Sequence, residues 1–230
     1  MSQDVSRVVK PKKIVCFVGK SGTGKTTWAL QFKKYMSFVS SRTTREAREG
    51  EVHGEPPFHK FLDGNDYLKD VVTNGKVALN DLSRGDDIMV ADTSFGGNTY
   101  WATASDIFKD DDSMVGYIID PEGVAKLFKI RDIARDKIAE NGWSFKTAPY
   151  VYSLAFSTFY IVYVDAAQKI LDNIPQDRKD RDAVQESLWV LCEGFAHERI
   201  KTPYIENVNK REFYMSRSAK KLVSIWRCAW

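Results

Sequence analysis

The stretch Gly19–Thr26 has residue types and a spacing that suit phosphate chemistry. It reads GKSGTGKT and fits the pattern G-x-x-x-x-G-K-[ST] at every fixed position. Glycines let the backbone curl so that successive N–H groups point at phosphate oxygens, and the N-terminus of a following helix favours an anion. The lysine reaches the β and γ phosphates of a nucleotide, and the next hydroxyl ligates Mg²⁺. We therefore expect a phosphate-binding loop for a nucleoside triphosphate, with ATP and Mg²⁺ as cofactors.

The motif also names the residues that should contact the nucleotide. Lys25 is expected to act in catalysis as well as in binding, and Thr26 is the expected Mg²⁺ ligand. The full expected set is Gly19, Ser21, Gly22, Thr23, Gly24, Lys25, Thr26 and Thr27.

A second group of residues that suits an anion lies at positions 40–54. Arg45 and Arg48 are three residues apart and follow a run of hydroxyl side chains. Guanidinium groups match the flat, multidentate demands of a phosphate monoester. Two anion sites so close in sequence suggest two phosphorylated substrates that face one another. The charge pattern alone leaves open a basic surface loop, in which the arginines pair with the glutamates of the same stretch.

Strands and helices are expected to alternate around these residues. The apolar run Ile14–Val18 is typical of a strand buried on both faces of a parallel sheet, and it leads directly into the phosphate loop. Further strands are expected at 38–40, 77–79, 88–91, 115–119 and 159–164, and helices at 25–35, 121–141, 183–198 and 219–229. This order predicts an α/β protein with a mainly parallel central sheet and helices on both faces.

Composition sets limits on the class of protein. The chain has 230 residues, 43% apolar and 28% charged, which is typical of a globular domain. A formal net charge of +3 argues against a protein that coats nucleic acid. The longest apolar run, 159–164, is too short to cross a bilayer, and no signal-peptide pattern appears. Three scattered cysteines fit a reducing compartment. We expect a cytoplasmic protein, a monomer or homodimer, without a membrane or nucleic-acid partner.

The stretch 40–54 resembles the GMP-binding segment of guanylate kinases, whose pattern is close to S-x-T-T-R-x-x-R-x-G-E-x-x-G. The residues in register are Ser41, Thr43, Thr44, Arg45, Arg48, Gly50, Glu51 and Gly54. Two downstream stretches are similar to further family motifs: FGGNTY at 95–100 to G-N-Y-Y-G, and IIDPEG at 118–123 to D-I-D-x-Q-G. Residues 159–164 are similar to the family's last core strand, and residues 167–182, which follow it, are similar to the arginine-bearing lid. The likeness is dense over 14–54 and patchy elsewhere.

The resemblance implies a three-layer P-loop kinase fold with a nucleoside monophosphate (NMP)-binding segment and a lid. A single domain over 1–230 would comprise a core at about 12–37, 88–172 and 183–230, an NMP-binding segment at about 38–87 and a lid at about 173–182. The implied activity is transfer of the ATP γ-phosphoryl group to a nucleoside or deoxynucleoside monophosphate.

The resemblance also implies roles for single residues. Ser41, Arg45, Arg48 and Tyr100 would hold the acceptor nucleotide, and Asp120 would lie near the metal and the acceptor. Arg178 and Arg181 would close over the transferring group. The implied catalytic residues are Lys25, Arg45, Arg178 and Arg181.

The departures from the family pattern concern the base of the acceptor. Pro56, Pro57 and Phe58 replace a phosphate-binding tyrosine, and Phe58 can stack on a ring but cannot donate a hydrogen bond. Strict register puts Ala91 where the family has a guanine-reading glutamate. The neighbouring Asp92 either reads a base edge or is a metal-side aspartate. Segments near 82–87 and 141–156 have no family counterpart. The acceptor base, GMP-like or modified, therefore stays open.

Two alternatives to an NMP kinase remain from the sequence. One is a P-loop kinase for another substrate, either a polynucleotide 5′ end or a small molecule. The other is a non-catalytic guanylate-kinase-like interaction module, although such modules commonly lose the phosphate loop that is complete here.

Overall fold

The structure is a computed structural model that describes residues 9–74 and 87–228. The strand expected at 77–79 lies outside the described residues, and so does the segment near 82–87 apart from Asp87.

Five strands form a central sheet in the order β2-β7-β1-β8-β9. They are β1 (Lys13–Val18), β2 (Ser37–Phe38), β7 (Met114–Ile118), β8 (Thr158–Ala166) and β9 (Glu198–Thr202). All neighbouring pairs are parallel, which confirms the expected α/β class. Because parallel strands end at the same edge of a sheet, the segments that follow β1, β7 and β8 lie next to one another.

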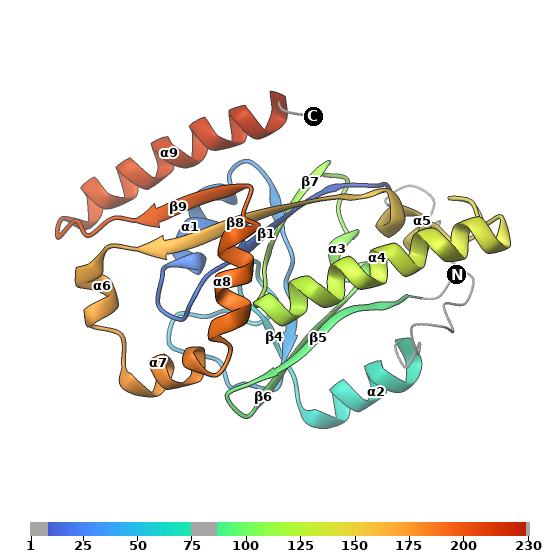
Figure 1. The fold of residues 1–230 in the computed structure, drawn as a ribbon, viewed down its shortest axis with the longest axis horizontal. Coiled ribbons are helices and arrows are strands. Elements are labelled where there is room, and N and C mark those ends of the chain that lie inside the picture. Colours follow the sequence, from blue (N-terminus) through green and yellow to red (C-terminus); the bar gives the residue numbers. More distant parts are fainter. Residues whose placement is uncertain (1–8, 75–86, 229–230) are drawn as a thin grey trace.

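Helices cover both faces of this sheet, because alternate residues of β1 pack into different clusters. Ile14 and Cys16 contact the cluster under α4 (Pro121–Asn141), α5 (Pro149–Phe156) and α8 (Glu186–Gly194). Phe17 contacts the cluster under α1 (Lys25–Phe32) and α9 (Val208–Cys228). Figure 1 shows α9 on one side of the sheet and α4 and α5 on the other. The expected three layers are present.

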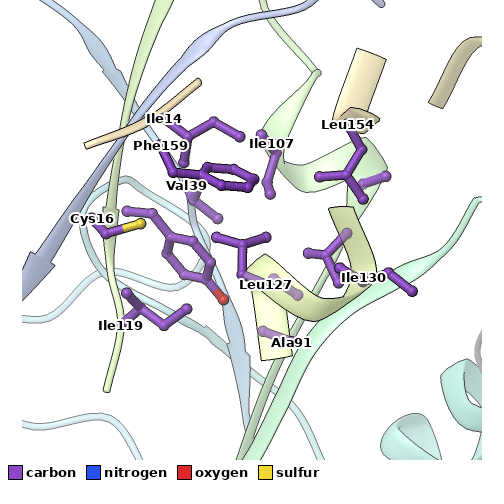
Figure 2. Packing of buried hydrophobic residues seen from close by; sticks show 14 of the residues in the cluster. Ile14, Cys16, Val39, Ala91, Ile107, Ile119, Leu127, Ile130, Leu154 and Phe159 are labelled. Carbon is purple, nitrogen blue, oxygen red and sulfur yellow. The ribbon is translucent and has the colours of Figure 1, made fainter. Parts of the chain in front are cut away.

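Figure 2 shows the first of these clusters from close by. Ile14, Leu127 and Leu154 are fully buried there, and Ala91 from another part of the chain lies at its border. The core of the main sheet therefore continues without a break to the strand that carries Ala91.

A second sheet of four short strands lies beside the first, in the order β4-β3-β6-β5. Its strands are β3 (Arg42–Thr43), β4 (Lys60–Phe61), β5 (Met89–Phe95) and β6 (Asn98–Thr103), and the helix α2 (Gly64–Asn74) packs on it. The sheet contains Arg42 and Thr43 of the stretch at 40–54 and the ends of the FGGNTY stretch. Of the strands after residue 87, β6 pairs with β3, which comes before that point, and β5 joins the sheet through β6.

The helix that begins at Pro121 has the expected limits. The side chain of Asp120 accepts a hydrogen bond from the Gly123 amide at 2.8 Å, which caps the first turn. Gly142, with φ 61°, ends the helix in a left-handed conformation that glycine adopts without strain.

Several other elements differ from the sequence-based expectation. The helix expected at 183–198 covers only 186–194, since Glu198 already begins the edge strand β9. The helix expected from 219 begins at Val208. The expected lid contains α7 (Gln176–Ala183) after the short α6 (Gln168–Asp172), and α3 (Ala104–Ile107) follows β6. Charged residues on exposed faces hide the apolar periodicity in β9 and in the first half of α9.

Candidate active site

The phosphate loop joins β1 to α1 and is held tightly by its neighbours. A Cβ on Gly19 would lie 2.2 Å from the Val164 carbonyl oxygen of β8, so only glycine fits there. Gly24 has φ 91° and directly precedes α1. Its own close neighbour is Thr202, which donates to the Thr23 carbonyl and accepts from the Trp28 indole at 3.0 Å. These contacts give the loop a fixed curve.

Lys25 lies inside this curve. Its ammonium donates to the carbonyl oxygens of Gly19 and Lys20, at 2.9 Å for the latter. Burial lowers the pKa of Lys25 to about 8, although Asp182 and Asp120 oppose the shift. A buried cation held only by neutral carbonyls is ready to exchange them for a phosphate.

Four arginines and Lys25 line one cavity of about 380 Å³, which we call the transfer cavity. Thr26 and Thr27 at the start of α1 and Tyr100 of β6 also line it. The arginines are Arg45, Arg48, Arg178 and Arg181. Among the described residues, Glu51 is the only acidic side chain in its walls. Residues from the two sequence motifs and from the lid are thus brought together around one space with a strong positive charge.

Two of these arginines have different surroundings. Arg45 forms a two-point ion pair with Glu51, at 2.9 and 3.0 Å, so the pairing considered from sequence does occur. It occurs in the wall of the cavity, where it fixes the direction of the guanidinium. Burial, together with repulsion from Arg45 and Arg178, lowers the pKa of Arg48 from its usual value. A bound phosphate would relieve that repulsion.

A second cavity, of about 160 Å³, opens beside the first, and we call it the acceptor chamber. Its walls include Ser41, Ala91, Thr93 and Ile119, with Asp120 at the end of β7. The Thr93 hydroxyl and the Gly123 amide both donate to the Asp120 carboxylate. Burial raises the pKa of Asp120, although these two hydrogen bonds oppose the shift. The chamber is mostly apolar, and Asp120 and Asp182 are the carboxylates that line it among the described residues.

Two residues expected at the acceptor lie elsewhere. The Asp92 carboxylate is held by the Tyr67 hydroxyl at 3.1 Å and by the Lys126 ammonium at 3.3 Å, and it lines neither cavity. Strand alternation is the reason, since the neighbours Ala91 and Thr93 face the chamber. Phe58 also lines neither cavity, and its carbonyl accepts from the Ser40 hydroxyl at 2.7 Å.

His59 is a site residue that the sequence did not single out. It lines both the acceptor chamber and the transfer cavity. The parallel pairing of Arg42 with Lys60 puts His59 beside Ser41, and its Nδ1 lies 2.8 Å from the Ser41 hydroxyl. The short strand Lys60–Phe61 is the feature that places His59 in the site. A strand of two residues can be recognised only when its pairing partner is known.

Asp182 of α7 is the other residue that the sequence did not single out. It is 5% exposed, and its carboxylate accepts from the Ser21 amide at 2.7 Å and from the Ser21 hydroxyl at 3.1 Å. Nearby, Lys20 and Glu186 form an exposed ion pair at 2.7 Å. These contacts attach the lid to the phosphate loop and place a negative charge near Lys25.

A third cavity, of about 530 Å³, extends from the phosphate loop on the side of the lid. Gly22 and Arg178 line both this cavity and the transfer cavity. Tyr204, after β9, lies across from them with Lys169 over its ring, 4.2 Å from the ring centre. A flat ring and a triphosphate could therefore occupy adjoining spaces.

Comparison with known proteins bears on the fold. No protein-family model and no curated protein sequence matches the chain. Among solved structures, a crystal structure of guanylate kinase from Anaplasma phagocytophilum matches with a TM-score of 0.56 and 17% sequence identity. The match covers 96% of this chain and 88% of that chain. The fold is therefore similar to that of a guanylate kinase. At this identity the likeness concerns the fold alone, so function must be argued from the site.

No helix in the described part of the chain is long and apolar enough to span a bilayer.

Proposed function

We propose that the protein is an ATP-dependent nucleoside monophosphate kinase, acting on a ribo- or deoxynucleotide. One observation carries the proposal: Lys25 of the phosphate loop and the four arginines line a single cavity. A protein-interaction module would have no reason to gather five cations there, since like charges repel one another and a partly buried cation costs free energy when no anion is near it. Two phosphorylated groups that meet in this cavity would supply the anions.

The proposed arrangement assigns each substrate its own space. The triphosphate of ATP would lie on the phosphate loop, with its nucleoside in the third cavity near Tyr204. The acceptor phosphate would lie between Arg45 and Arg48 near Tyr100, and its base would enter the acceptor chamber. An oxygen of the acceptor phosphate would attack the γ phosphorus, and the bond from that phosphorus to the β–γ bridging oxygen would break, which yields ADP and a nucleoside diphosphate.

The protein's contribution to this step is position and charge. Lys25, Arg178 and Arg181 would neutralise the equatorial oxygens, and Arg45 and Arg48 would hold the attacking group in line. Lid arginines of this kind are worth about 10³-fold or more in rate. Thr26 lines the transfer cavity, which suits its hydroxyl as a ligand for Mg²⁺ bound with the nucleotide; that ion would add positive charge to neutralise the phosphates.

Two parts of the chain would move during the reaction. A single kinase domain would contain an acceptor segment at about 38–87 and a lid at about 173–182, and both would close to exclude water from the transferring group. A cytoplasmic location fits such an enzyme.

A coupled assay of ADP release tests the proposal across ribo- and deoxynucleoside monophosphates, including modified pyrimidines. We expect at least one of them to be phosphorylated, and we expect Lys25→Ala to remove that activity. A parallel arm offers oligonucleotides with a free 5′ hydroxyl. Phosphorylation of these alone would favour the polynucleotide alternative.

Calorimetric titration with ATP completes the test. Absence of ATP binding by the unmodified protein would contradict the proposal and would favour the interaction module. Binding that Lys25→Ala abolishes would support it.

A further inference from the structure

His59 lies at the point where the acceptor chamber and the transfer cavity meet, and it lines both. Its ring is held between aromatic neighbours: the Tyr100 ring centre lies 5.6 Å away and the Phe61 ring centre 6.2 Å away, both in edge-on contact. These contacts fix the plane of the imidazole, so its nitrogens have defined directions.

One of the two ring nitrogens has a partner. Nδ1 and the Ser41 hydroxyl are 2.8 Å apart, while no hydrogen bond to Nε2 occurs within the described residues. Two tautomers satisfy the Ser41 contact. In one of them the hydroxyl donates to Nδ1 and the proton is on Nε2; in the other Nδ1 donates and Nε2 has a free lone pair.

The charges around His59 distinguish these tautomers once an anion is bound. Arg45 and Arg48 face it from the same loop, and Glu51 is the acidic group opposite them. A phosphate in the transfer cavity would repel a lone pair on Nε2 and attract an N–H there. The arginines of the transfer cavity favour a bound anion. A bound anion in turn favours the tautomer with the proton on Nε2.

We propose that His59, held at Nδ1 by the Ser41 hydroxyl, donates a hydrogen bond from its Nε2–H to the acceptor's phosphate, alongside Arg45 and Arg48. This inference rests on the proposed function. It makes His59 a substrate-binding residue that no motif in the sequence indicates, and it gives Ser41 a positioning role through the ring.

The protonation state of the ring supports this role. Burial, with repulsion from Arg45 and Arg48, lowers the pKa of His59 to about 4, while Glu51 and a hydrogen bond to the Ser41 backbone oppose the shift. The imidazole of the free protein is therefore neutral from pH 5.5 to 8. It acts as a dipolar donor and not as a third cation, so its contribution should not vary with pH in that range.

Three substitutions of His59 separate the two nitrogens. His59→Gln places an amide N–H near the position of Nε2, His59→Asn places one near Nδ1, and His59→Phe keeps the ring without either. We expect His59→Asn and His59→Phe to raise the acceptor KM between tenfold and a hundredfold, which is the usual loss for a hydrogen bond to a charged group. We expect His59→Gln to restore the KM to within about threefold. The ATP Kd should stay unchanged in all three.

His53→Asn is the matched control. His53 is exposed, accepts from the Phe61 amide at 3.2 Å and lines neither cavity, so its replacement should leave both constants unchanged. Thermal melting of each variant shows whether a change in KM comes from loss of folding.

The pH dependence of the acceptor KM tests this role further, because a purely structural role of His59 would not change it. The ratio of acceptor KM between His59→Phe and the unmodified protein should be constant from pH 5.5 to 8, because the titration of the acceptor's own phosphate cancels in the ratio. A ratio that falls about tenfold per pH unit near neutrality would mean that an imidazolium binds the phosphate, and it would overturn the proposal.

Nitrogen-15 NMR of labelled histidine tests the tautomer without any turnover. We expect the Nε2-protonated form after addition of the preferred monophosphate, or of GMP if none is phosphorylated. The Nδ1-protonated form would overturn the inference. If the enzyme phosphorylates a monophosphate but His59→Phe leaves the KM unchanged, the inference fails and the proposed function stands. If nothing is phosphorylated, the function fails first.

Discussion

The phosphate loop and the acceptor side form their anion sites by different means. The loop is one continuous stretch of backbone, and its shape depends on Gly19 and Gly24, which fit closely against β8 and Thr202. The acceptor side is built from side chains of separate strands: Arg48 from the loop after β3, His59 before β4 and Tyr100 from β6.

This difference affects how each site responds to change. A backbone site loses little when a single side chain is altered, because the N–H groups remain. A side-chain site loses an entire charged donor with each substitution. The acceptor side should therefore be the more sensitive of the two to mutation, and Lys25 is the one side chain on which the loop depends.

On the acceptor side, the largest expected effect is at Arg48. Its guanidinium lies in the transfer cavity near two other arginines, so a bound phosphate should be its main partner. We expect Arg48→Ala to lower kcat/KM for the acceptor about a hundredfold and to leave the ATP Kd within twofold. Steady-state kinetics and calorimetry measure the two constants. Arg199→Ala is the control, since Arg199 is exposed and pairs with Glu193 away from the site.

Arg45→Ala should have a similar effect, with an additional loss of stability because Glu51 loses its ion pair. Unchanged acceptor KM in both variants would show that the acceptor phosphate binds elsewhere.

The titration of Lys25 should have a smaller effect, a rise in the ATP Kd of about tenfold for each pH unit. Its pKa of about 8 in the free protein lies below that of an exposed lysine, and only the charged form attracts phosphate. The ATP Kd should be flat below pH 8 and should rise above it, until the pKa of the bound state is reached. Acceptor KM should show no such rise, because arginines stay protonated.

Calorimetry from pH 7 to 9.5 checks this contrast, with Lys25→Arg as the variant in which the rise should disappear. If the ATP Kd and the acceptor KM rose equally with pH, the proposed difference between the two sites would be wrong.

The smallest expected effect concerns the lid. The Asp182 carboxylate is buried against the Ser21 amide and near Lys25, so it opposes a bound triphosphate. Asp182→Asn keeps a hydrogen-bond acceptor for that amide and removes the charge, and we expect ATP to bind about fivefold more tightly. Glu186→Gln, which alters only the exposed pair with Lys20, should change the ATP Kd less than twofold. Weaker ATP binding by Asp182→Asn would instead mean that the carboxylate organises the loop.

Local sequence determined the phosphate loop, the strand before it and the helix that begins at Pro121. Each of these depends on short-range rules: a glycine-rich turn, a run of apolar residues, and a capping aspartate followed by proline and ended by glycine. The α/β class followed from their alternation. The resemblance of the sequence to a family pattern also predicted that Arg45, Arg48, Arg178 and Arg181 act together. All four line one cavity.

Tertiary structure decided which side chains face that cavity. Asp92 faces Lys126 because strand alternation turns its neighbours Ala91 and Thr93 to the chamber. His59 reaches Ser41 because two strands of only two residues each pair in parallel. Such pairings depend on contacts between residues far apart in sequence, and a two-residue strand carries no periodicity that could reveal them.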